Sequence, residues 1–400
     1  LLHDLARKYD AAARRVYGPP LPQPATRRPG RVRIGYLGAD LRNHVMGKQM
    51  WAAIEHHDRS RFELSFWSTS TEHDAWTDRY RGFGERFDVI ADLSERAAAA
   101  RIADADLDLL VDLSTNTKGG KPGILALKPA RVQMTHIASA GTVGLAAIDF
   151  KLTDRFCEVP ENQQYQLETL LPMDGCAYPY RHVAPAVDHP FHRAPLGIAA
   201  EAVVIGAFAN MWKLSRRCLG LWREVLARVP RARLAFSPLS AAMRDRYLRL
   251  AAAAGIAEER LLFLPQGRDD AEGLARYSLV DFSLDTMPYG GVNGTLEALD
   301  MGVPVVTLVG SRHGERTSYS ILANLGVTQT AALTPEAYVE TAVRLAVDPA
   351  FMSEVRASIR AGLANSPLTD MPAHTRALER AYVAALAAKA PAALKASGIA

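Results

Sequence analysis

The sequence predicts two α/β domains in series, each a doubly wound parallel sheet with helices on both faces. Two observations support this fold class. Short apolar runs, typical of buried strands, alternate with longer segments of helical periodicity, and this alternation favours a parallel sheet with right-handed crossovers. The chain also has 400 residues, which is too long for one typical core, so two domains are expected.

The first predicted element is an amphipathic helix from Leu1 to Tyr17. Five apolar residues fall on one of its faces at helical spacing, namely Leu2, Leu5, Tyr9, Ala13 and Val16. Prolines end the helix, and a Pro/Arg-rich linker runs to Gly30. Residues 1–30 are therefore expected to form a separate segment, either the end of a helical array or an ordinary N-terminal cap.

The first α/β domain is expected over residues 31–180. Its predicted strands are Val32–Leu37, Phe62–Trp67, Asp88–Ile90, Leu107–Asp112, Val132–Ile137 and Phe150–Thr153. Helical segments such as Arg96–Ala105 lie between them. A stretch rich in Pro and His without periodicity, Pro179–Gly197, is the predicted linker to the second domain.

The second α/β domain is expected over residues 198–388. Its predicted strands are Ala202–Phe208, Arg233–Phe236, Leu261–Leu264, Leu279–Leu284 and Val303–Val309. Its predicted helices are Ser215–Arg228, Ala241–Gly255, Leu296–Gly302, Pro335–Leu345, Pro349–Leu363 and Met371–Ala388. Ligands of such sheets bind outside the carboxyl ends of the strands, so a ligand cleft between the two domains is expected.

Composition excludes several classes of function. The formal net charge of +4 is spread along the chain, so no basic stripe for nucleic acid is expected. The three cysteines, Cys157, Cys176 and Cys218, form no Cys-x-x-Cys pair, which argues against a zinc site or a disulfide framework. Apolar runs fall short of the roughly 18 residues of a membrane helix, and the N-terminus has no signal pattern. We therefore expect a cytoplasmic protein without a membrane partner.

The glycine-rich segment Asp285–Glu297 joins a predicted strand to a predicted helix. Such a turn lets the backbone approach an anion closely, and the first turn of the helix offers unpaired N–H groups. The segment therefore predicts a phosphorylated ligand.

Polar residues that could serve the same ligand follow the first strand of the second domain. Asn210 and Lys213 lie at that strand's carboxyl end, just before a helix that Ser215 is expected to cap. A lysine there can neutralise a phosphate as a compact point charge. A single lysine at a helix start is more commonly just solvated, but its place beside the turn favours a functional role.

Two polar clusters follow strands of the first domain. The first contains Asp40 and His44, and this histidine could act as a general base or could merely cap the next helix. The second contains Asn116, Lys118 and Gly119, which could line the cleft or form an ordinary glycine-rich turn.

Familiar catalytic motifs do not occur in the chain. It has no Gly-x-Ser-x-Gly elbow, no Walker-type loop and no His-Glu-x-x-His helix. His136, His313 and the pair His56-His57 have no partner at metal-ligand spacing. The sequence thus favours a site that holds phosphate with backbone and lysine, without a metal or other cofactor.

Together these residues resemble the catalytic region of the O-linked N-acetylglucosamine transferase family, which includes the Spindly-type enzymes. The resemblance covers nearly all of Arg31 to Ala388. The motifs that carry it in the first domain are Asp40–His44, Lys118–Gly119, Leu127–Gln133, Gly141–Thr142, Asp149 and Thr153–Asp154. Those in the second are Phe208–Lys213, Asp285–Tyr289, Glu297–Leu299, Met301–Val306 and Arg316.

The resemblance implies a fold of the GT-B type with two Rossmann-like domains. It implies transfer of N-acetylglucosamine from UDP-N-acetylglucosamine to Ser or Thr of acceptor proteins, with inversion and without a metal. Tetratricopeptide repeats are implied upstream, and the helix Leu1–Tyr17 would belong to them.

By position, the resemblance assigns Lys213 to the donor diphosphate and Asn210 to the neighbourhood of the nucleotide. Glu297 is assigned to the ribose hydroxyls, and His44 to the reacting sugar. Asp40, Asn116, Lys118, Gly119 and Arg316 are expected to line the cleft. The phosphates are assigned to the turn residues Gly291, Val292, Asn293, Gly294 and Thr295.

The chain departs from the family mainly within that turn. The family usually carries a run of threonines where this chain has Val292-Asn-Gly-Thr295, and Leu41 and Ala140 replace a usual Phe and Pro. Two rival interpretations therefore stay open. One is a related enzyme that uses another nucleotide sugar, such as GDP-fucose or UDP-glucose. The other is a repeat-bearing scaffold whose transferase domain has lost activity.

Overall fold

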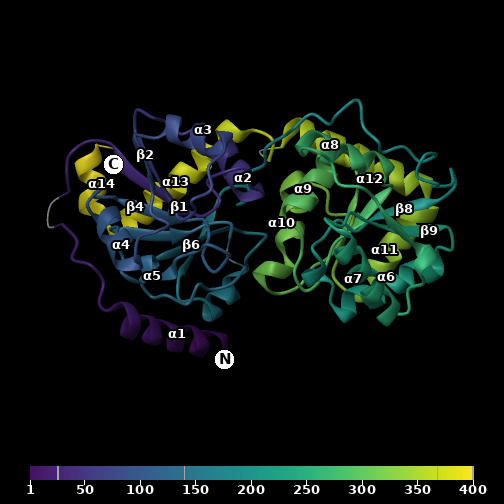
Figure 1. Ribbon diagram of the computed structural model, residues 1–400, viewed down its shortest axis with the longest axis horizontal. Coiled ribbons are helices and arrows are strands. Elements are labelled where there is room, and N and C mark those ends of the chain that lie inside the picture. Colours follow the sequence, from purple (N-terminus) through teal and green to yellow (C-terminus); the bar gives the residue numbers. More distant parts are fainter. Residues whose placement is uncertain (25–26, 139, 367, 399–400) are drawn as a thin grey trace. The chain divides into compact units, whose positions relative to one another are not determined.

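The computed structural model describes residues 1–24, 27–138, 140–366 and 368–398 (Figure 1). The chain divides into two compact units. Unit 1 comprises Leu1–Arg181 and Asp370–Ala400, and unit 2 comprises His182–Thr369. Each unit is built on one parallel sheet, so the predicted fold class is confirmed.

Unit 1 contains a seven-stranded sheet with the strand order β3-β2-β1-β4-β5-β6-β7. Its strands are β1 (Val32–Gly38), β2 (Phe62–Ser68), β3 (Arg86–Val89), β4 (Leu109–Asp112), β5 (Val132–Thr135), β6 (Phe150–Asp154) and β7 (Thr169–Met173). Its helices are α1 (Leu2–Tyr17), α2 (Val45–Ile54), α3 (Ala75–Phe83), α4 (Glu95–Ala103), α5 (Pro122–Ala126), α13 (Met371–Lys389) and α14 (Pro391–Ser397). Strand β7 and helix α14 were not predicted, and helices α2, α3 and α5 lie between predicted strands, where helical segments were expected without stated bounds.

Side chains alternate between two cores across the sheet of unit 1. Ile34 and Tyr36 of β1 belong to one apolar cluster, which also contains residues of α2 and α13. Leu37 belongs to the other, which contains residues of α1, α4 and α5. This period of two is the geometry of a strand, and all seven residues of β1 are buried.

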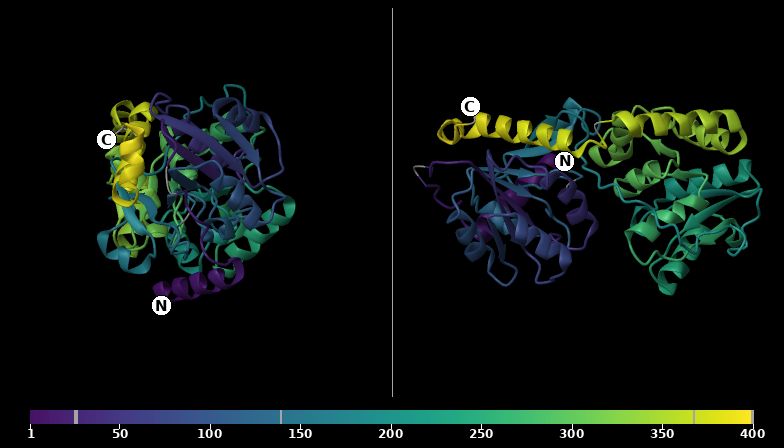
Figure 2. Two further views of the ribbon diagram at one scale, coloured as in Figure 1. Left: turned by 90° about the vertical axis from the view of Figure 1, so that its left-hand side faces the viewer. Right: turned by 90° about the horizontal axis from the view of Figure 1, so that it is seen from above.

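Helix α13 packs on unit 1, although the sequence-based division assigned it to the second domain, 198–388. Leu378, Tyr382 and Leu386 lie in the same cluster as the sheet residues of unit 1. The Tyr382 hydroxyl lies 3.2 Å from that of Tyr36, and Glu379 Oε1 lies 2.9 Å from His57 Nδ1. In Figure 2 this yellow helix lies over the blue and purple elements of unit 1. The position of α13 near the end of the chain does not indicate that it packs against a sheet whose strands lie within residues 32–173.

Helix α1 also belongs to unit 1. The sequence-based division at residue 30 had set this helix apart from the first domain. The helix buries the small residues Ala6 and Ala13, and its Asp10 accepts a hydrogen bond from the N–H of Ala146 at 2.9 Å. The larger residues of the predicted apolar face stay exposed: Leu2, Leu5, Tyr9 and Val16. Small side chains let this helix approach the body of the unit closely.

Unit 2 contains a six-stranded parallel sheet with the order β10-β9-β8-β11-β12-β13. Its strands are β8 (Val203–Gly206), β9 (Ala232–Phe236), β10 (Leu261–Phe263), β11 (Phe282–Leu284), β12 (Val305–Leu308) and β13 (Ala331–Ala332). Its helices are α6 (Arg216–Arg228), α7 (Ala241–Ala253), α8 (Asp270–Ala275), α9 (Asn293–Asp300), α10 (Thr317–Leu325), α11 (Pro335–Val347) and α12 (Pro349–Asn365).

Helix α9 begins three residues before the predicted start at Leu296. The carbonyl of Val292 accepts the N–H groups of Thr295 and Leu296, at 3.1 and 3.0 Å. The helix ends before Gly302, whose φ of 70° is a left-handed conformation that glycine adopts without strain. The predicted glycine-rich turn therefore already contains the first helical turn.

The described part of the chain contains no helix that is both long and apolar enough to cross a membrane. Cys157, Cys176 and Cys218 are all buried, and none of them forms a disulfide within the described residues.

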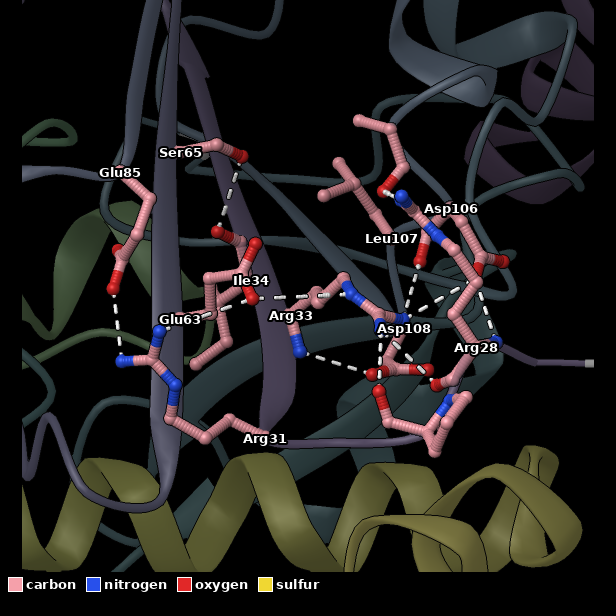
Figure 3. Close-up of polar contacts among 12 residues, drawn as sticks. Arg28, Arg31, Arg33, Ile34, Glu63, Ser65, Glu85, Asp106, Leu107 and Asp108 are labelled. Atoms are coloured by element: carbon pink, nitrogen blue, oxygen red, sulfur yellow. Dashed lines mark hydrogen bonds and ion pairs between the residues drawn. The ribbon is translucent and has the colours of Figure 1, made fainter.

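A buried ion network joins the linker to the amino ends of β1 and β4 (Figure 3). Asp108 has 1% of its side chain exposed and lies 2.8 Å from Arg27 Nε. It also accepts the backbone N–H of Arg33 at 2.9 Å. Asp106 accepts the Arg33 guanidinium at 3.2 Å and the N–H of Arg28 at 3.0 Å. The network fixes the start of the sheet at the edge opposite the candidate residues.

We expect Asp108→Ala to lower the free energy of unfolding by about 3–5 kcal/mol, because it leaves buried donors without a partner. Glu63→Ala is the control, because the side chain of Glu63 is 37% exposed and its distance of 4.0 Å from Arg31 and Arg33 makes weak ion pairs. That variant should lose less than about 1 kcal/mol. Urea denaturation measures both, and equal losses would contradict the assignment.

Candidate functional site

The candidate residues lie at the topological switch points of the two sheets. In unit 1 the strand order reverses direction between β1 and β4, and in unit 2 between β8 and β11. Ligands of doubly wound sheets bind at such points, outside the carboxyl ends of the strands. The loops that leave these four strands carry Asp40, His44, Asn116, Lys118, Gly119, Asn210, Lys213 and the segment Asp285–Glu297.

In unit 2, Asp285 organises the turn after β11. Its Oδ1 accepts the N–H groups of Thr286 at 2.9 Å and of Gly291 at 2.7 Å. Its Oδ2 accepts the hydroxyl of Thr307 in β12 at 2.7 Å. A carboxylate thus fixes both ends of the turn. The sequence signal for this role, an acidic residue just after a buried strand, was available but was not interpreted.

The amino end of α9 offers backbone donors in this turn. No side chain caps the helix at Val292, and the first N–H groups of a helix have no partner within it. Gly291 lies close to the helix, because a Cβ there would come within 2.8 Å of Thr295 Oγ1. The hydroxyl of Thr295 is bonded to Ser318 at 2.8 Å. Backbone groups, more than side-chain hydroxyls, are therefore the donors that this turn could offer to an anion.

Lys213 contacts the same turn from the loop after β8. Its Nζ donates to the carbonyl of Gly290 at 2.7 Å and lies 4.5 Å from the centre of the Tyr289 ring. Burial lowers the pKa of the Lys213 amine, and the negative charge of Asp285 opposes that shift. The structure thus brings the predicted lysine and the predicted turn together.

Glu297 is held at the centre of a polar group behind the turn. Asn293 Nδ2 donates to its Oε1 at 2.5 Å, and the Tyr277 hydroxyl donates to its Oε2 at 3.2 Å. The Arg276 guanidinium lies 3.5 Å from the same carboxylate. Burial raises the pKa of Glu297, and Arg276, Asn293 and Tyr277 act against that rise. The side chain of Asn293 therefore helps to position Glu297.

Two further predicted residues of unit 2 have local partners. Asn210 is exposed and accepts the N–H of Trp212 at 3.1 Å, which caps a short 3-10 turn, Met211–Lys213. Arg316 donates to the carbonyl of Gly310 at 2.9 Å. Asn210 remains beside Lys213, whereas Arg316 has a structural contact of its own.

In unit 1, His44 is the N-cap of α2 and is 42% exposed. Its Nδ1 lies 3.3 Å from the N–H of Met46 and 3.3 Å from Asp40 Oδ2. With a lone pair on Nδ1, the ring caps the helix. With a proton on Nδ1, it donates to Asp40 and leaves Nε2 free to accept a proton. Each of the two predicted roles therefore corresponds to one tautomer.

The loop after β4 carries the other candidates of unit 1. Asn116 and Lys118 are exposed, and the carbonyl of Gly119 accepts the Thr69 hydroxyl at 2.8 Å. Asp112 fixes the base of this loop by accepting the N–H groups of Ser114 and Thr115, at 3.2 and 3.0 Å. Burial raises the pKa of Asp112 to about 7, against these hydrogen bonds. As in unit 2, an acid at the end of a strand organises the loop.

The family comparison is decided by a match that covers most of the chain. The model of glycosyl transferase family 41 matches residues 17–176 and 190–378. The chain belongs to glycosyl transferase family 41. This confirms the resemblance noted in the sequence and the prediction of a glycosyltransferase.

Individual relatives agree with this family 41 assignment. The chain is 32% identical over 358 residues to the probable UDP-N-acetylglucosamine–peptide N-acetylglucosaminyltransferase SPINDLY of Arabidopsis thaliana, covering 88% of this chain and 39% of that protein. It is 27% identical over 396 residues to the protein named SEC of the same plant, covering 95% of this chain and 40% of that protein. The chain thus spans about two fifths of the length of these curated relatives.

A solved structure supports the fold of the family 41 chain. A mutant of the O-GlcNAc transferase of Thermobaculum terrenum superposes with a TM-score of 0.85 at 31% identity, covering 98% of this chain and 74% of that one. The GT-B-type fold with two Rossmann-like units is therefore confirmed.

Within residues 1–24, 27–138, 140–366 and 368–398, no group of three or more His, Cys, Asp or Glu side chains is placed to hold a metal ion. The predicted independence from metal stays a prediction.

We expect Gly291→Ala to lower the free energy of unfolding by about 1–3 kcal/mol, because the added methyl group overpacks the turn against Thr295. Gly220→Ala is the control. Gly220 lies inside α6 with open space around a new Cβ, so that variant should gain about 0.5–1 kcal/mol. Chemical denaturation compares the two, and a neutral Gly291→Ala would show that the turn is loosely packed.

Proposed function

We propose that this chain carries the catalytic region of an inverting glycosyltransferase that moves N-acetylglucosamine from UDP-N-acetylglucosamine to Ser or Thr hydroxyls of proteins. The observation that supports it most is the convergence of Lys213 and the amino end of α9 on one turn at the switch point of unit 2. Family membership gives the class of reaction. The donor named for the SPINDLY relatives supports UDP-N-acetylglucosamine as the sugar nucleotide.

Loss of the nucleoside diphosphate develops negative charge that must be stabilised. A lysine ammonium and the N–H groups of a helix terminus supply positive potential at fixed positions. Such preorganised groups are worth a few kcal/mol each in a site that excludes water. This chemistry needs no metal, so we propose a reaction without metal or other cofactor.

Glu297 is proposed to accept the ribose hydroxyls. Its carboxylate is held by Asn293, Tyr277 and Arg276, and 23% of its side chain stays exposed. The side chain of Asn293 thereby positions Glu297, the residue proposed to bind the ribose. It does not supply a hydroxyl group that could contact the phosphates.

His44 is proposed to act at the acceptor. In the tautomer that donates Nδ1–H to Asp40, Nε2 can take the proton of the attacking hydroxyl. The acceptor oxygen then bonds to the anomeric carbon while the bond to the diphosphate breaks, which inverts that carbon. Asn116, Lys118 and Gly119 would line the acceptor side in unit 1.

The remaining parts of the proposal come from the sequence and from its resemblance to the family. The partners are a nucleotide sugar and acceptor proteins, the location is cytoplasmic, and helical repeats precede the catalytic region. GDP-fucose or UDP-glucose as donor, and a scaffold without activity, are the alternatives.

One experiment decides among these. Purified protein is incubated with a test protein and each of UDP-N-acetylglucosamine, UDP-glucose and GDP-fucose, and mass spectrometry detects the added sugar. Transfer from UDP-N-acetylglucosamine alone supports the proposal. Transfer from another donor replaces it, and the absence of both transfer and nucleotide binding favours the scaffold.

Lys213→Ala is expected to reduce turnover at least about 100-fold while the protein stays folded, because the diphosphate loses its cation. Arg217→Ala is the control, since Arg217 is an exposed cation in the first turn of α6. Steady-state kinetics with the preferred donor measure both variants. Near-normal turnover of Lys213→Ala would remove the phosphate assignment.

His44→Ala is expected to reduce turnover more than it weakens UDP binding, because the imidazole acts on the acceptor and not on the nucleotide. His44→Asn separates the two roles, since asparagine is a good N-cap but no base. Calorimetry with UDP and kinetics are compared for both. If His44→Asn restores turnover, the histidine is a helix cap only.

A further inference from the structure

Lys213 differs from every other strongly basic residue of unit 2. It is the only lysine between His182 and Thr369, where the other strongly basic residues are arginines. An arginine keeps its charge when buried, whereas a lysine amine can lose its proton. Burial lowers the pKa of Lys213, so its charge depends on its surroundings.

Lys213 and Asp285 hold the same peptide group. The carbonyl of Gly290 accepts Lys213 Nζ at 2.7 Å, and the N–H of Gly291 donates to Asp285 Oδ1 at 2.7 Å. These two atoms belong to one peptide bond. The peptide is therefore oriented from one side by a cation and from the other by an anion.

Asp285 is itself fixed by its neighbours. Thr286 N–H and the Thr307 hydroxyl bond to its carboxylate, and the Tyr338 hydroxyl bonds to its backbone carbonyl at 3.0 Å. The residue is 7% exposed. Its charge therefore acts from a set position in a medium of low dielectric, where it is weakly screened.

We propose that Asp285 is a positioning residue for the phosphate site: it orients the Gly290–Gly291 peptide and keeps the Lys213 amine protonated. The proposal rests on the proposed function, in which that amine contacts the donor diphosphate. A neutral amine could not offset the charge that develops as the diphosphate leaves.

The other groups near this pair do not compete with Asp285. The Tyr289 ring and the Gly290 carbonyl face Lys213 without a net charge. Cys218 and Tyr338 lie near Asp285, but burial raises the pKa of the Cys218 thiol to about 12 and raises that of Tyr338 above its usual value. Both stay neutral near neutral pH, so among the described residues Asp285 supplies the charge that acts on Lys213.

The sign of the effect follows from these charges. The Lys213 amine is charged below its pKa and neutral above it. Removing the negative charge of Asp285 lowers that pKa further, because the opposite charge no longer favours the ammonium form. The protonated amine is then lost at a lower pH than in the wild type.

The test is Asp285→Asn, which keeps the shape of the side chain and an acceptor oxygen for the turn. Trace acetylation of the full chain over a pH series, read by mass spectrometry of the Lys213 peptide, reports the unprotonated amine. We expect its midpoint to fall by about 1 pH unit in Asp285→Asn. Thr307→Val, which removes a hydrogen bond to the same carboxylate but no charge, should keep the wild-type midpoint.

An unchanged midpoint in folded Asp285→Asn would overturn the proposal, and so would an equal fall in Thr307→Val. If circular dichroism shows that Asp285→Asn does not fold, Asp285→Glu takes its place. That variant keeps the charge, so its midpoint should stay at the wild-type value, and a clear fall would overturn the proposal.

UDP binding separates this inference from the proposed function. Asp285→Asn should weaken UDP binding more at pH 9 than at pH 6, by up to about 10-fold, because a midpoint lower by about 1 pH unit reduces the protonated fraction of Lys213 by at most that factor. An equal loss at both values would overturn the role of the charge. If the wild-type protein binds no UDP, the proposed function fails, while the acetylation result still decides whether Asp285 protonates Lys213.

Discussion

Both units depend on the hydrogen bonding of a parallel sheet whose central strand is buried on both faces. Every residue of β1 and of β8 is buried, so polar function cannot lie along these strands. Polar functional residues are therefore found in the loops that follow the carboxyl ends of these strands. At the two switch points, the loops of neighbouring strands run in opposite directions and leave room for a ligand. The candidate residues of both units follow from this constraint.

The loops at the switch points need their own internal support, because they leave the sheet with unpaired backbone groups. An aspartate serves this purpose twice. Asp112 holds the N–H groups after β4, and Asp285 holds those after β11. In unit 2 the same carboxylate also lies near the one lysine of that unit. Support of the loop and control of charge are thus combined in one residue.

The altered turn of this family member has a physical explanation in the structure. At the positions where the family resemblance leads one to expect threonines, Asn293 holds Glu297 and Thr295 bonds to Ser318. Side chains here support the site, and backbone N–H groups are left to meet the ligand. In the proposed donor site, the phosphates would therefore contact the helix terminus and Lys213 more than hydroxyl groups.

The sequence by itself determined the two parallel sheets, most of their strands, and the segment at which Lys213 would meet a phosphate turn. These follow from local periodicity and from the rule that places ligands beyond strand ends. Tertiary structure alone decided that α13 completes unit 1, that Glu297 is held by Tyr277 and Arg276, and that Asp285 and Lys213 hold one peptide. The physical reason is that these arrangements depend on contacts such as Lys213 with Gly290 and Tyr277 with Glu297, which join residues 77 and 20 positions apart. Their energy comes from burial, hydrogen bonding and charge pairing that no local sequence pattern records.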